Sequence, residues 1–451
     1  MINPEIFRQY DIRGIASKDM TADDVMRIGQ GIGTYLQQQG NRYVAVGRDC
    51  RTTSDEYAER MIEGLVATGC RVVDIGVCPT PVSYFAIRHL ETEGAVMVTA
   101  SHNPPEYNGF KICSGVDSVF GEQIQQIRAI IDEGAFQKGA GAVESYEILP
   151  DYIEYIIDNI ELRRPLRVGL DAGNGTAGIT AVPIIENLGC EVHELYTDMD
   201  GTFPNHEADP TVAANMAELV ALVKEKGLDV GLGFDGDGDR LGVVDADGSL
   251  VYGDQLMILF SREILGRKPG ATFVSEVKCS QTMYDDIEKH GGRAIMWKTG
   301  HSMIKKKMKE VQAELAGEMS GHLFFADRYM GFDDATYAAC RLLEILAAER
   351  KTIAQLLADV PKTYNTPEIR MDCPDDIKFD VVARVTEYFR QREKVIDIDG
   401  VRVLFDGGWG LVRASNTQPA LVLRFEALSQ ERLSEIRSRV ETVLEKIKTE
   451  V

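Results

Sequence analysis

The chain reads Leu166-Arg-Val-Gly-Leu-Asp171, an apolar run that ends in an acidic residue, and after a helical segment it continues as Gly189-Cys190-Glu191-Val-His193. A strand, a helix, a glycine turn and a second strand are the parts of a βα unit. Residues 42–75 and 271–296 repeat this order. Because any α/β protein contains such segments, the spacing alone fits both a single α/β protein and three related α/β domains in tandem.

The C-terminal part follows a different pattern. Lys394-Val-Ile-Asp-Ile398 is followed by Asp399-Gly400, a dipeptide that favours a tight type I′ hairpin, and then by Val401-Arg-Val-Leu-Phe405. A glycine-rich loop at residues 407–410 precedes a predicted strand at 420–427. A final helix has apolar residues three or four positions apart, which marks one buried face, at Leu433, Ile436, Val440, Leu444 and Ile447. We therefore expect an α+β domain of hairpins and two helices.

Length and composition agree with a globular protein of several domains. The chain has 451 residues, of which 44% are hydrophobic. At about 100–200 residues per domain, this length predicts about two to four domains. The patterns above place the boundaries near residues 145, 250 and 362. The predicted domains are therefore α/β domains at 1–145, 146–250 and 251–362 and an α+β domain at 363–451.

The charge of the chain argues against a protein that binds nucleic acid. Its 49 Lys and Arg residues against 71 Asp and Glu residues give a formal net charge of −22, and no basic run exceeds Lys305-Lys306-Lys307. No apolar run approaches the roughly 18 residues that span a bilayer, and the first residues are too charged for a signal peptide. The eight Cys residues form no C-x2-C pair. We therefore expect a reduced, cytoplasmic enzyme that binds neither nucleic acid nor membranes.

One loop that directly follows an apolar strand carries a hydroxyl group. It reads Val98-Thr99-Ala100-Ser101-His102-Asn103-Pro104-Pro105, after the predicted strand at 94–98. A Ser at the end of a buried strand lies where α/β proteins place their reactive groups. Taken alone, an ordinary Ser or Asx turn is the simpler explanation of this loop.

A second loop is strongly acidic. It reads Gly233-Phe-Asp235-Gly236-Asp237-Gly238-Asp239-Arg240 and follows the apolar strand at 229–234, which argues against a solvated turn. Three carboxylates can converge only if a cation offsets their repulsion, and oxygen ligands suit Mg²⁺ or Ca²⁺. An EF-hand that starts at Asp235 is excluded, because Arg240 and Ala246 stand where it requires Gly and Glu.

Two further loops contain polar clusters. Ala316-Gly317-Glu318-Met319-Ser320-Gly321-His322 offers carboxylate, hydroxyl and imidazole groups, which suit a polyhydroxyl ligand such as a sugar. Gly410-Leu-Val-Arg413-Ala-Ser415-Asn416-Thr417-Gln-Pro419 offers one Arg, two hydroxyls and an amide, which suit a phosphate. Each loop alone also fits a structural role, but four such loops in one chain make coincidence improbable.

Further motifs lie between these loops, namely Tyr10-Asp11-Ile12-Arg13-Gly14, Asn108-Gly-Phe-Lys111, Val277-Lys278 and Thr299-Gly300-His301-Ser302. Together with the four loops, and in the same order, they resemble the α-D-phosphohexomutases and, within them, the phosphomannomutase/phosphoglucomutase group. The resemblance covers nearly the whole chain. It implies an α/β fold of four domains around a central cleft, in which three related α/β domains precede a smaller C-terminal α+β domain.

The resemblance also implies an isomerase that moves a phosphoryl group between C1 and C6 of a hexose phosphate. Ser101 would carry the phosphoryl group, and Arg240 would stabilise the charge of that group during transfer. Lys111 and His301 are the implied groups for proton transfer. The implied Mg²⁺ ligands are Ser101, through its phosphoryl oxygen, Asp235, Asp237 and Asp239.

The remaining implied residues bind the substrate. The accessory residues that line the cleft are Tyr10, Arg13 and Lys278. The residues that hold the sugar hydroxyls are Glu318, Ser320 and His322. The residues that grip the phosphate that is not reacting are Arg413, Ser415, Asn416 and Thr417. With Mg²⁺ counted, these assignments predict a locally positive cleft in an acidic protein.

The implied reaction passes through hexose 1,6-bisphosphate, which is both intermediate and activator. The bisphosphate must turn over within the cleft before it returns its other phosphoryl group to Ser101. Because water would hydrolyse the phosphoserine, the cleft has to close, and the glycine-rich run before Arg413 fits a hinge or lid. We expect the chain to act on small-molecule hexose phosphates as a monomer or weak homodimer.

The choice of sugar rests on one position. Met319 resembles enzymes that accept mannose and glucose phosphates, whereas phosphoglucosamine mutases usually have Gln there, so a phosphoglucosamine mutase is one alternative. A second alternative is a haloacid-dehalogenase-like phosphotransferase with Asp235 as nucleophile, since Asp235-Gly-Asp237 ends a strand. That alternative leaves the Ser101 loop unexplained and lacks the expected Thr or Val at Asp239.

Overall fold

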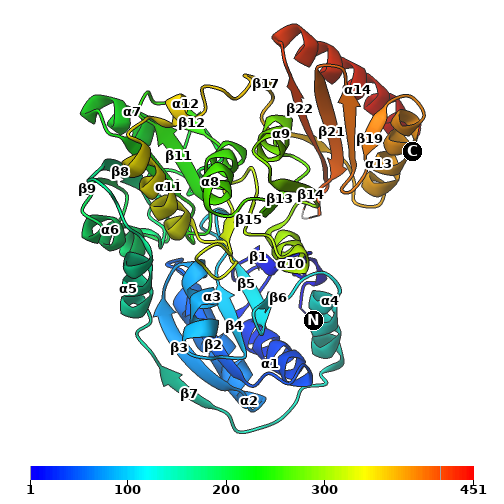
Figure 1. The fold of residues 1–451 in the computed structure, drawn as a ribbon. Coiled ribbons are helices and arrows are strands. Elements are labelled where there is room, and N and C mark those ends of the chain that lie inside the picture. Colours follow the sequence, from blue (N-terminus) through cyan, green and yellow to red (C-terminus); the bar gives the residue numbers. More distant parts are fainter. Residues whose placement is uncertain (1, 417, 451) are drawn as a thin grey trace.

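The computed structural model describes residues 2–416 and 418–450. Within these residues, four sheets follow one another along the chain. Figure 1 shows the first sheet, in blue, below the next two, in green and yellow, while the fourth, in orange and red, projects to one side.

The first sheet is formed by β1 (Ile12–Ile15), β2 (Tyr43–Arg48), β3 (Arg71–Val77), β4 (Gly94–Val98), β5 (Tyr107–Ser114), β6 (Asp117–Ser118) and β7 (Ala142–Ser145). Its order is β1-β5-β4-β2-β3-β7, and β6 pairs with β5. The accompanying helices are the 3-10 helix η1 (Pro4–Ile6), α1 (Ala22–Gln38), α2 (Ser54–Ala67), α3 (Thr80–His89) and α4 (Glu122–Glu133). β4 is buried along its whole length, which explains its uninterrupted apolar sequence.

The second sheet has the order β12-β11-β10-β8-β9. Its strands are β8 (Arg167–Asp171), β9 (Glu191–Leu195), β10 (Val230–Phe234), β11 (Leu241–Asp245) and β12 (Leu250–Val251). Its helices are α5 (Leu149–Asn159), α6 (Gly178–Asn187) and α7 (Ala217–Lys226).

The third sheet has the order β14-β13-β15-β16. Its strands are β13 (Thr272–Glu276), β14 (Arg293–Trp297), β15 (Leu315–Gly317) and β16 (Leu323–Phe325). Its helices are α8 (Gly253–Arg267), α9 (Gln281–Lys289), α10 (His301–Val311), α11 (Ala335–Glu349) and α12 (Ile353–Leu356).

The first three sheets share one topology. Each contains the order β3-β2-β4-β5, β9-β8-β10-β11 or β14-β13-β15-β16, in which three parallel strands are followed by one antiparallel strand. The loop between the third and fourth strands of this unit holds Ser101, Asp235 or Glu318, respectively. The three polar loops are therefore equivalent positions of a repeated fold. This confirms three related α/β domains and excludes a single α/β domain.

The fourth sheet is antiparallel and has the order β17-β22-β21-β20-β19, with β18 paired to β22. Its strands are β17 (Tyr364–Asn365), β18 (Ile369–Asp372), β19 (Lys394–Ile396), β20 (Val401–Phe405), β21 (Gly408–Ala414) and β22 (Ala420–Ala427). Its helices are α13 (Lys378–Arg390) and α14 (Gln430–Glu450). The predicted apolar face of α14 is buried, which confirms the C-terminal α+β domain.

The glycine-rich run is not a loop or hinge as predicted, because Gly408 and Gly410 lie within β21. A Cβ on Gly408 would lie 2.4 Å from the carbonyl oxygen of Glu426, and one on Gly410 would lie 2.9 Å from the ring of Phe425. These glycines therefore permit close packing inside the sheet. Only Gly407, with φ +74, serves a turn.

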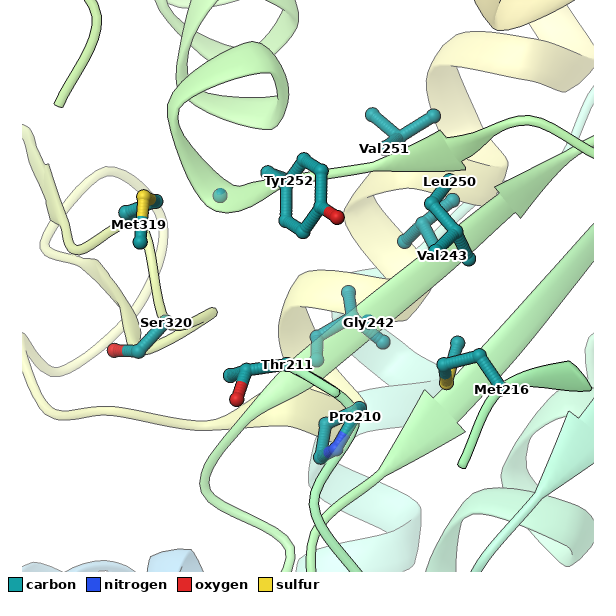
Figure 2. Close-up of a pocket in the computed structure, with 12 residues that line it drawn as sticks. Pro210, Thr211, Met216, Gly242, Val243, Leu250, Val251, Tyr252, Met319 and Ser320 are labelled. Atoms are coloured by element: carbon teal, nitrogen blue, oxygen red, sulfur yellow. The ribbon is translucent and has the colours of Figure 1, made fainter. Parts of the chain in front are cut away.

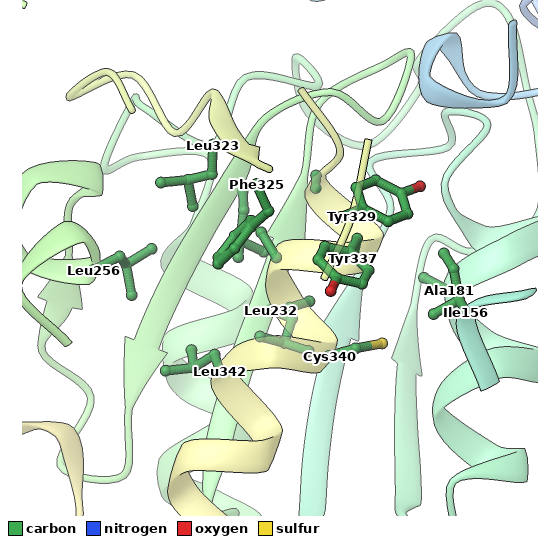
Figure 3. Packing of buried hydrophobic residues seen from close by; sticks show 14 of the residues in the cluster. Ile156, Ala181, Leu232, Leu256, Leu323, Phe325, Tyr329, Tyr337, Cys340 and Leu342 are labelled. Atoms are coloured by element: carbon green, nitrogen blue, oxygen red, sulfur yellow. The ribbon is translucent and has the colours of Figure 1, made fainter. Parts of the chain in front are cut away.

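One continuous apolar core joins the first three domains. In Figure 3, α11 carries Tyr337, Cys340 and Leu342 between Ile156 and Ala181 on one side and Leu256 on the other. Burial of such side chains is the main source of stability, at about 25 cal/mol per Å² of apolar surface.

The fourth domain has its own core and a smaller contact with the third. Arg402 stacks on Trp409, with its guanidinium carbon 3.7 Å from the ring centre, and donates to the carbonyls of Val277 and Cys279 at 2.8 and 2.7 Å. Among the described residues, no helix combines the length and apolar character that crossing a membrane requires.

Candidate active site

A cleft of about 1150 Å³ lies where the four domains meet. Each domain contributes to its lining, for example through Ser101, Arg240, Glu318 and Arg413. The lining contains eight Lys or Arg residues and five Asp or Glu residues, whereas the chain has 49 and 71. The cleft is therefore enriched in positive charge, as the binding of an anionic ligand requires.

Ser101 lies in the loop after β4 in a strained conformation. Its φ of +51° is in the left-handed region, which costs a residue with a side chain roughly 1–3 kcal/mol. Its Oγ donates to Oδ2 of Asp235 at 2.8 Å, and its main-chain N–H donates to Oγ1 of Thr99 at 2.9 Å. The acidic loop approaches closely because Gly236 has no side chain, and a Cβ there would lie 2.6 Å from the carbonyl oxygen of Ser101.

The acidic loop joins β10 to β11, and the carboxylates of Asp235, Asp237 and Asp239 are fully buried. Oδ1 of Asp235 accepts from the main-chain N–H groups of Asp239 and Arg240 at 3.0 and 3.1 Å. Oδ2 of Asp237 accepts from Oγ1 of Thr80 at 2.5 Å. Oδ1 of Asp237 and Oδ1 of Asp239 have no hydrogen-bond partner among the described residues.

This arrangement can hold a metal ion. One oxygen from each of Asp235, Asp237 and Asp239 lies within 4.8 Å of the others. Burial, together with the charges of its two neighbours, raises the pKa of Asp235 well above its usual range. Buried carboxylates with unpartnered oxygens are suitable ligands for a hard divalent cation, which would also remove their repulsion.

Lys111, on β5, is paired with the acidic loop. Its Nζ donates to Oδ2 of Asp237 at 2.6 Å and to Oδ2 of Asp239 at 2.5 Å. Burial opposes the charge of this side chain, but the two carboxylates outweigh it and raise the pKa of Lys111. Lys111 therefore acts as a counter-charge to the acidic loop in this structure, and its part in proton transfer stays a prediction.

Two histidines and an aspartate lie beside Arg240. Its Nε donates to Nε2 of His322 at 3.0 Å, so a neutral His322 carries its hydrogen on Nδ1. That Nδ1 lies 3.1 Å from Oδ2 of Asp333, and Nδ1 of His301 lies 3.7 Å from the same oxygen. Burial lowers the pKa of His301 well below its usual range, so this imidazole is neutral.

The predicted sugar loop follows β15. Oε1 of Glu318 accepts from the main-chain N–H of Gly300 at 2.7 Å, and Oε2 accepts from Oγ of Ser320 at 3.2 Å. Figure 2 shows Met319 and Ser320 across a small pocket from Tyr252. The pocket is about 10 Å³, which is room for no more than one water molecule.

Tyr10 joins three domains. Its hydroxyl donates to the carbonyl oxygen of Thr299 at 3.0 Å and accepts from Nδ2 of Asn416 at 2.8 Å. Burial raises the pKa of Tyr10 to about 12. Nearby, Nη1 of Arg13 donates to Oδ1 of Asn103 in the Ser101 loop at 2.6 Å. Tyr10 therefore connects the first domain to Thr299 and to the phosphate loop, and Arg13 is bound to the Ser101 loop.

Lys278, predicted to line the cleft, and Arg413, predicted to bind phosphate, are each paired with a carboxylate. Nζ of Lys278 lies 3.1 Å from Oε2 of Glu368 and 3.5 Å from Oε1 of Glu276, and Nε of Arg413 donates to Oδ2 of Asp399 at 3.0 Å. Ser415 and Asn416 line the same end of the cleft, and Thr417 lies outside the described residues.

Sequence patterns missed several of these carboxylates. Asp399 lies in the predicted hairpin connection, which spans residues 397–400 and is longer than a two-residue turn, and its carboxylate also accepts from Arg413. Asp333 lies in no recognised motif, and Glu368 directly precedes β18. Their partners are far away in the sequence, so no local pattern could have identified them.

Comparison with known proteins identifies one family along the chain. Its models, described as phosphoglucomutase/phosphomannomutase, match alpha/beta/alpha domain I at residues 4–138, domain II at 150–248, domain III at 252–364 and the C-terminal domain at 368–443.

Individual relatives are similar over nearly their whole length. The chain is 47% identical over 434 residues to a phosphomannomutase/phosphoglucomutase of Pseudomonas aeruginosa, covering 96% of this chain and 94% of that protein. It is 43% identical over 447 residues to a phosphoglucomutase of Neisseria meningitidis, covering 98% and 97%. The crystal structure of a phosphoglucomutase/phosphomannomutase family protein from Burkholderia thailandensis matches with a TM-score of 0.94 at 41% identity, covering 99% of this chain and 98% of that one.

Proposed function

The chain belongs to the phosphoglucomutase/phosphomannomutase family, and on this basis we propose that it interconverts the 1-phosphate and 6-phosphate of mannose, and also those of glucose. The observation that carries the proposal is the position of Ser101. Its hydroxyl lies 2.8 Å from the buried acidic loop and lines a cleft to which four domains contribute. A phosphoryl group on this oxygen would face both the acidic loop and Arg240.

We propose Mg²⁺ as the metal, with Asp235, Asp237, Asp239 and a phosphoryl oxygen on Ser101 as its ligands. When bound, the ion supplies positive charge that lowers the barrier to phosphoryl transfer. Arg240 adds a second positive charge from the protein side, since its Nε lies 3.9 Å from Oδ2 of Asp235, the oxygen that accepts from Ser101. Most of the catalytic effect would come from this alignment of charge, since phosphoryl transfer needs little covalent help.

The sugar hydroxyl that attacks the phosphoryl group must lose a proton. Because Lys111 is held as an ammonium ion between two carboxylates, we assign this step to His301, whose imidazole is neutral and lines the cleft. Asp333, beside Nδ1 of His301, would stabilise the imidazolium that forms. His322 becomes a second acceptor if Arg240 moves to the phosphate, because this frees its Nε2.

The two half-reactions use one set of binding groups. Ser101 donates its phosphoryl group to form hexose 1,6-bisphosphate, which reorients and returns the other phosphoryl group to the same serine. The phosphate that does not react would bind to Arg413, Ser415, Asn416 and Thr417. The cleft would be lined by Tyr10, Arg13 and Lys278. The sugar hydroxyls would bind to Glu318, Ser320 and His322. A sugar held mainly through its 3- and 4-hydroxyls tolerates either configuration at C2, which is consistent with use of both mannose and glucose.

The contacts of Asp235 argue against the dehalogenase-like alternative. Its Oδ1 accepts two main-chain N–H groups, which leaves only Oδ2 as a nucleophile, and the hydroxyl of Ser101 lies 2.8 Å from that oxygen and donates to it. Phosphopeptide mapping after incubation with hexose 1,6-bisphosphate tests this directly. Label on Ser101 is expected, and label on Asp235 alone would overturn the proposal.

The sugar is tested by comparing kcat/KM for mannose 1-phosphate, glucose 1-phosphate and glucosamine 1-phosphate. We expect mannose and glucose phosphates to be used well and glucosamine 1-phosphate poorly. A preference for glucosamine 1-phosphate would instead indicate a phosphoglucosamine mutase. The domain boundaries after residues 145, 250 and 362, the monomeric or weakly dimeric state and the cytoplasmic location remain predictions.

A further inference from the structure

Arg51 lies outside the cleft but holds the loop that carries Ser101. It follows β2, and its side chain is fully buried. Nη2 donates to the carbonyl oxygens of Ser101 and Asn103 at 2.7 and 2.6 Å, and Nη1 donates to those of Pro104 and Tyr107 at 2.7 and 3.1 Å. One guanidinium therefore binds three main-chain carbonyls of the Ser101 loop and that of Tyr107, the first residue of β5.

Neighbouring groups fix the guanidinium itself. Nε of Arg51 lies 3.2 Å from Oδ2 of Asp49, whose Oδ1 accepts from Oγ of Ser54 at 2.5 Å. The ring of Phe203, from the second domain, lies with its centre 5.0 Å from the guanidinium carbon. Charge, hydrogen bonds and an aromatic ring thus surround Arg51, which leaves it one position.

The Ser101 loop has few internal hydrogen bonds with which to hold its shape. Asn103 N donates to the carbonyl of Ala100 and Tyr107 N to that of Pro104, both at 3.0 Å, whereas Pro104 and Pro105 have no N–H to donate. Ser101 itself is in the strained left-handed region. Such a conformation persists only where its surroundings determine it strongly. From outside the loop, Arg51 contributes four hydrogen bonds to main-chain carbonyls, beside the single side-chain contacts of Arg13 with Asn103 and of Asp235 with Ser101.

We propose that Arg51 is a positioning residue for phosphoryl transfer, which keeps Oγ of Ser101 at its place against the acidic loop by binding the carbonyls around it. The inference rests on the proposed function of Ser101. An arginine suits this task because its five N–H donors lie in one rigid plane and can reach four separate acceptors. A lysine has three donors at a single point and cannot span the same four carbonyls.

The test compares Arg51→Lys with Arg48→Lys as a matched control. Arg48 lies three positions earlier, and its contacts are with Asp55 at 2.6 Å and Asp74 at 3.2 Å, not with the Ser101 loop. We expect Arg51→Lys to lower kcat by about 10-fold to 100-fold, since small displacements of a reacting group have effects of this size. KM for mannose 1-phosphate should stay within about threefold, because no substrate-binding group is changed.

The second readout is the rate at which hexose 1,6-bisphosphate phosphorylates Ser101, followed by mass spectrometry of the Ser101 peptide. It should fall with kcat in Arg51→Lys and change by less than about twofold in Arg48→Lys. Unchanged kcat and phosphorylation in a folded Arg51→Lys protein would overturn the inference, and so would a raised KM with unchanged kcat. Absence of mutase activity in the wild-type protein would instead overturn the proposed function.

If Arg51→Lys does not fold, Phe203→Leu tests the same role. This variant removes the aromatic cover of the guanidinium and leaves its donors in place. We expect kcat to fall by about threefold to tenfold, because a less restrained guanidinium holds the loop less well. Wild-type kcat in a folded Phe203→Leu protein would contradict the proposed role of Arg51.

Discussion

Lys111→Met perturbs the charge balance of the acidic loop while nearly preserving the shape of the side chain. Nζ of Lys111 contacts Asp237 and Asp239, whose carboxylates are fully buried. Removing one partner of a buried ion pair costs about 3–5 kcal/mol, because the other charge is left without compensation. As 1 kcal/mol shifts Tm by about 2–4 °C in domains of roughly this size, the expected decrease in Tm without divalent metal is about 6–20 °C.

Calorimetry in EDTA and in excess Mg²⁺ measures this effect. A cation bound by the acidic loop would offset the charge that the variant no longer balances, so Mg²⁺ should raise the Tm of Lys111→Met more than that of the wild type. Lys309→Met is the control, because Lys309 forms an exposed pair with Asp117 at 2.8 Å. Such a pair contributes less than about 1 kcal/mol.

Two results would refute the reasoning. If the Tm of Lys111→Met in EDTA were within about 2 °C of the wild-type value, the buried pair would not stabilise the loop. If Mg²⁺ raised both Tm values equally, the metal and Lys111 would not act on the same carboxylates.

Three other predictions concern a glycine, a buried carboxylate and the sugar loop. Gly300→Ala should lower both kcat and stability, because its Cβ would lie 2.7 Å from the ring of Tyr10 at a φ of +123. Gly291→Ala is the control, because Gly291 has a φ of +82 but open space around its Cα. Equal losses of activity of the two variants in steady-state assays would contradict the steric reason. Burial raises the pKa of Asp334 to about 6, whereas an Asp in an unfolded chain has a pKa of about 3.9. The protonated carboxyl therefore stabilises the folded state below a pH of about 4, and this contribution is lost as the pH rises through about 6. Asp334→Asn should lack this pH dependence. The free energies of unfolding of both proteins, measured in urea between about pH 4 and pH 6, test this. If the two values changed with pH in the same way, the proposed effect of Asp334 would be contradicted. Met319→Gln should raise kcat/KM for glucosamine 1-phosphate relative to mannose 1-phosphate, because it adds a donor and an acceptor to the sugar loop; an unchanged ratio would rule this out.

Much of the fold could be predicted because its signals are local. The apolar run of β4 and the helical spacing of Leu433 to Ile447 each reflect burial of neighbouring positions in one element. The prediction of a glycine-rich loop is wrong for Gly408 and Gly410, because the reason for these glycines is not local. They accommodate Glu426 and Phe425 of the adjacent strand, and a sequence pattern contains no information on that distance.

The same division applies to the site. Ser101, the acidic loop and the Glu318 loop could each be recognised as polar groups after apolar strands. The distances of Lys111 to two carboxylates support our proposal that it is a counter-charge, because a proton acceptor and a counter-charge differ only in their surroundings. No local pattern marks Arg51 or Asp333, because each contacts residues that are distant in the chain.

By itself, the sequence determined the repeated βα units, the order of the polar loops and the residue types that each loop offers, since these follow from side-chain chemistry and short-range spacing. Only the tertiary structure decided which groups meet. The shared topology of three domains places the loops after β4, β10 and β15 at equivalent positions, and domain packing brings them to one cleft. Pairing, burial and the resulting pKa shifts depend on distances between distant residues, and those distances exist only in the folded chain.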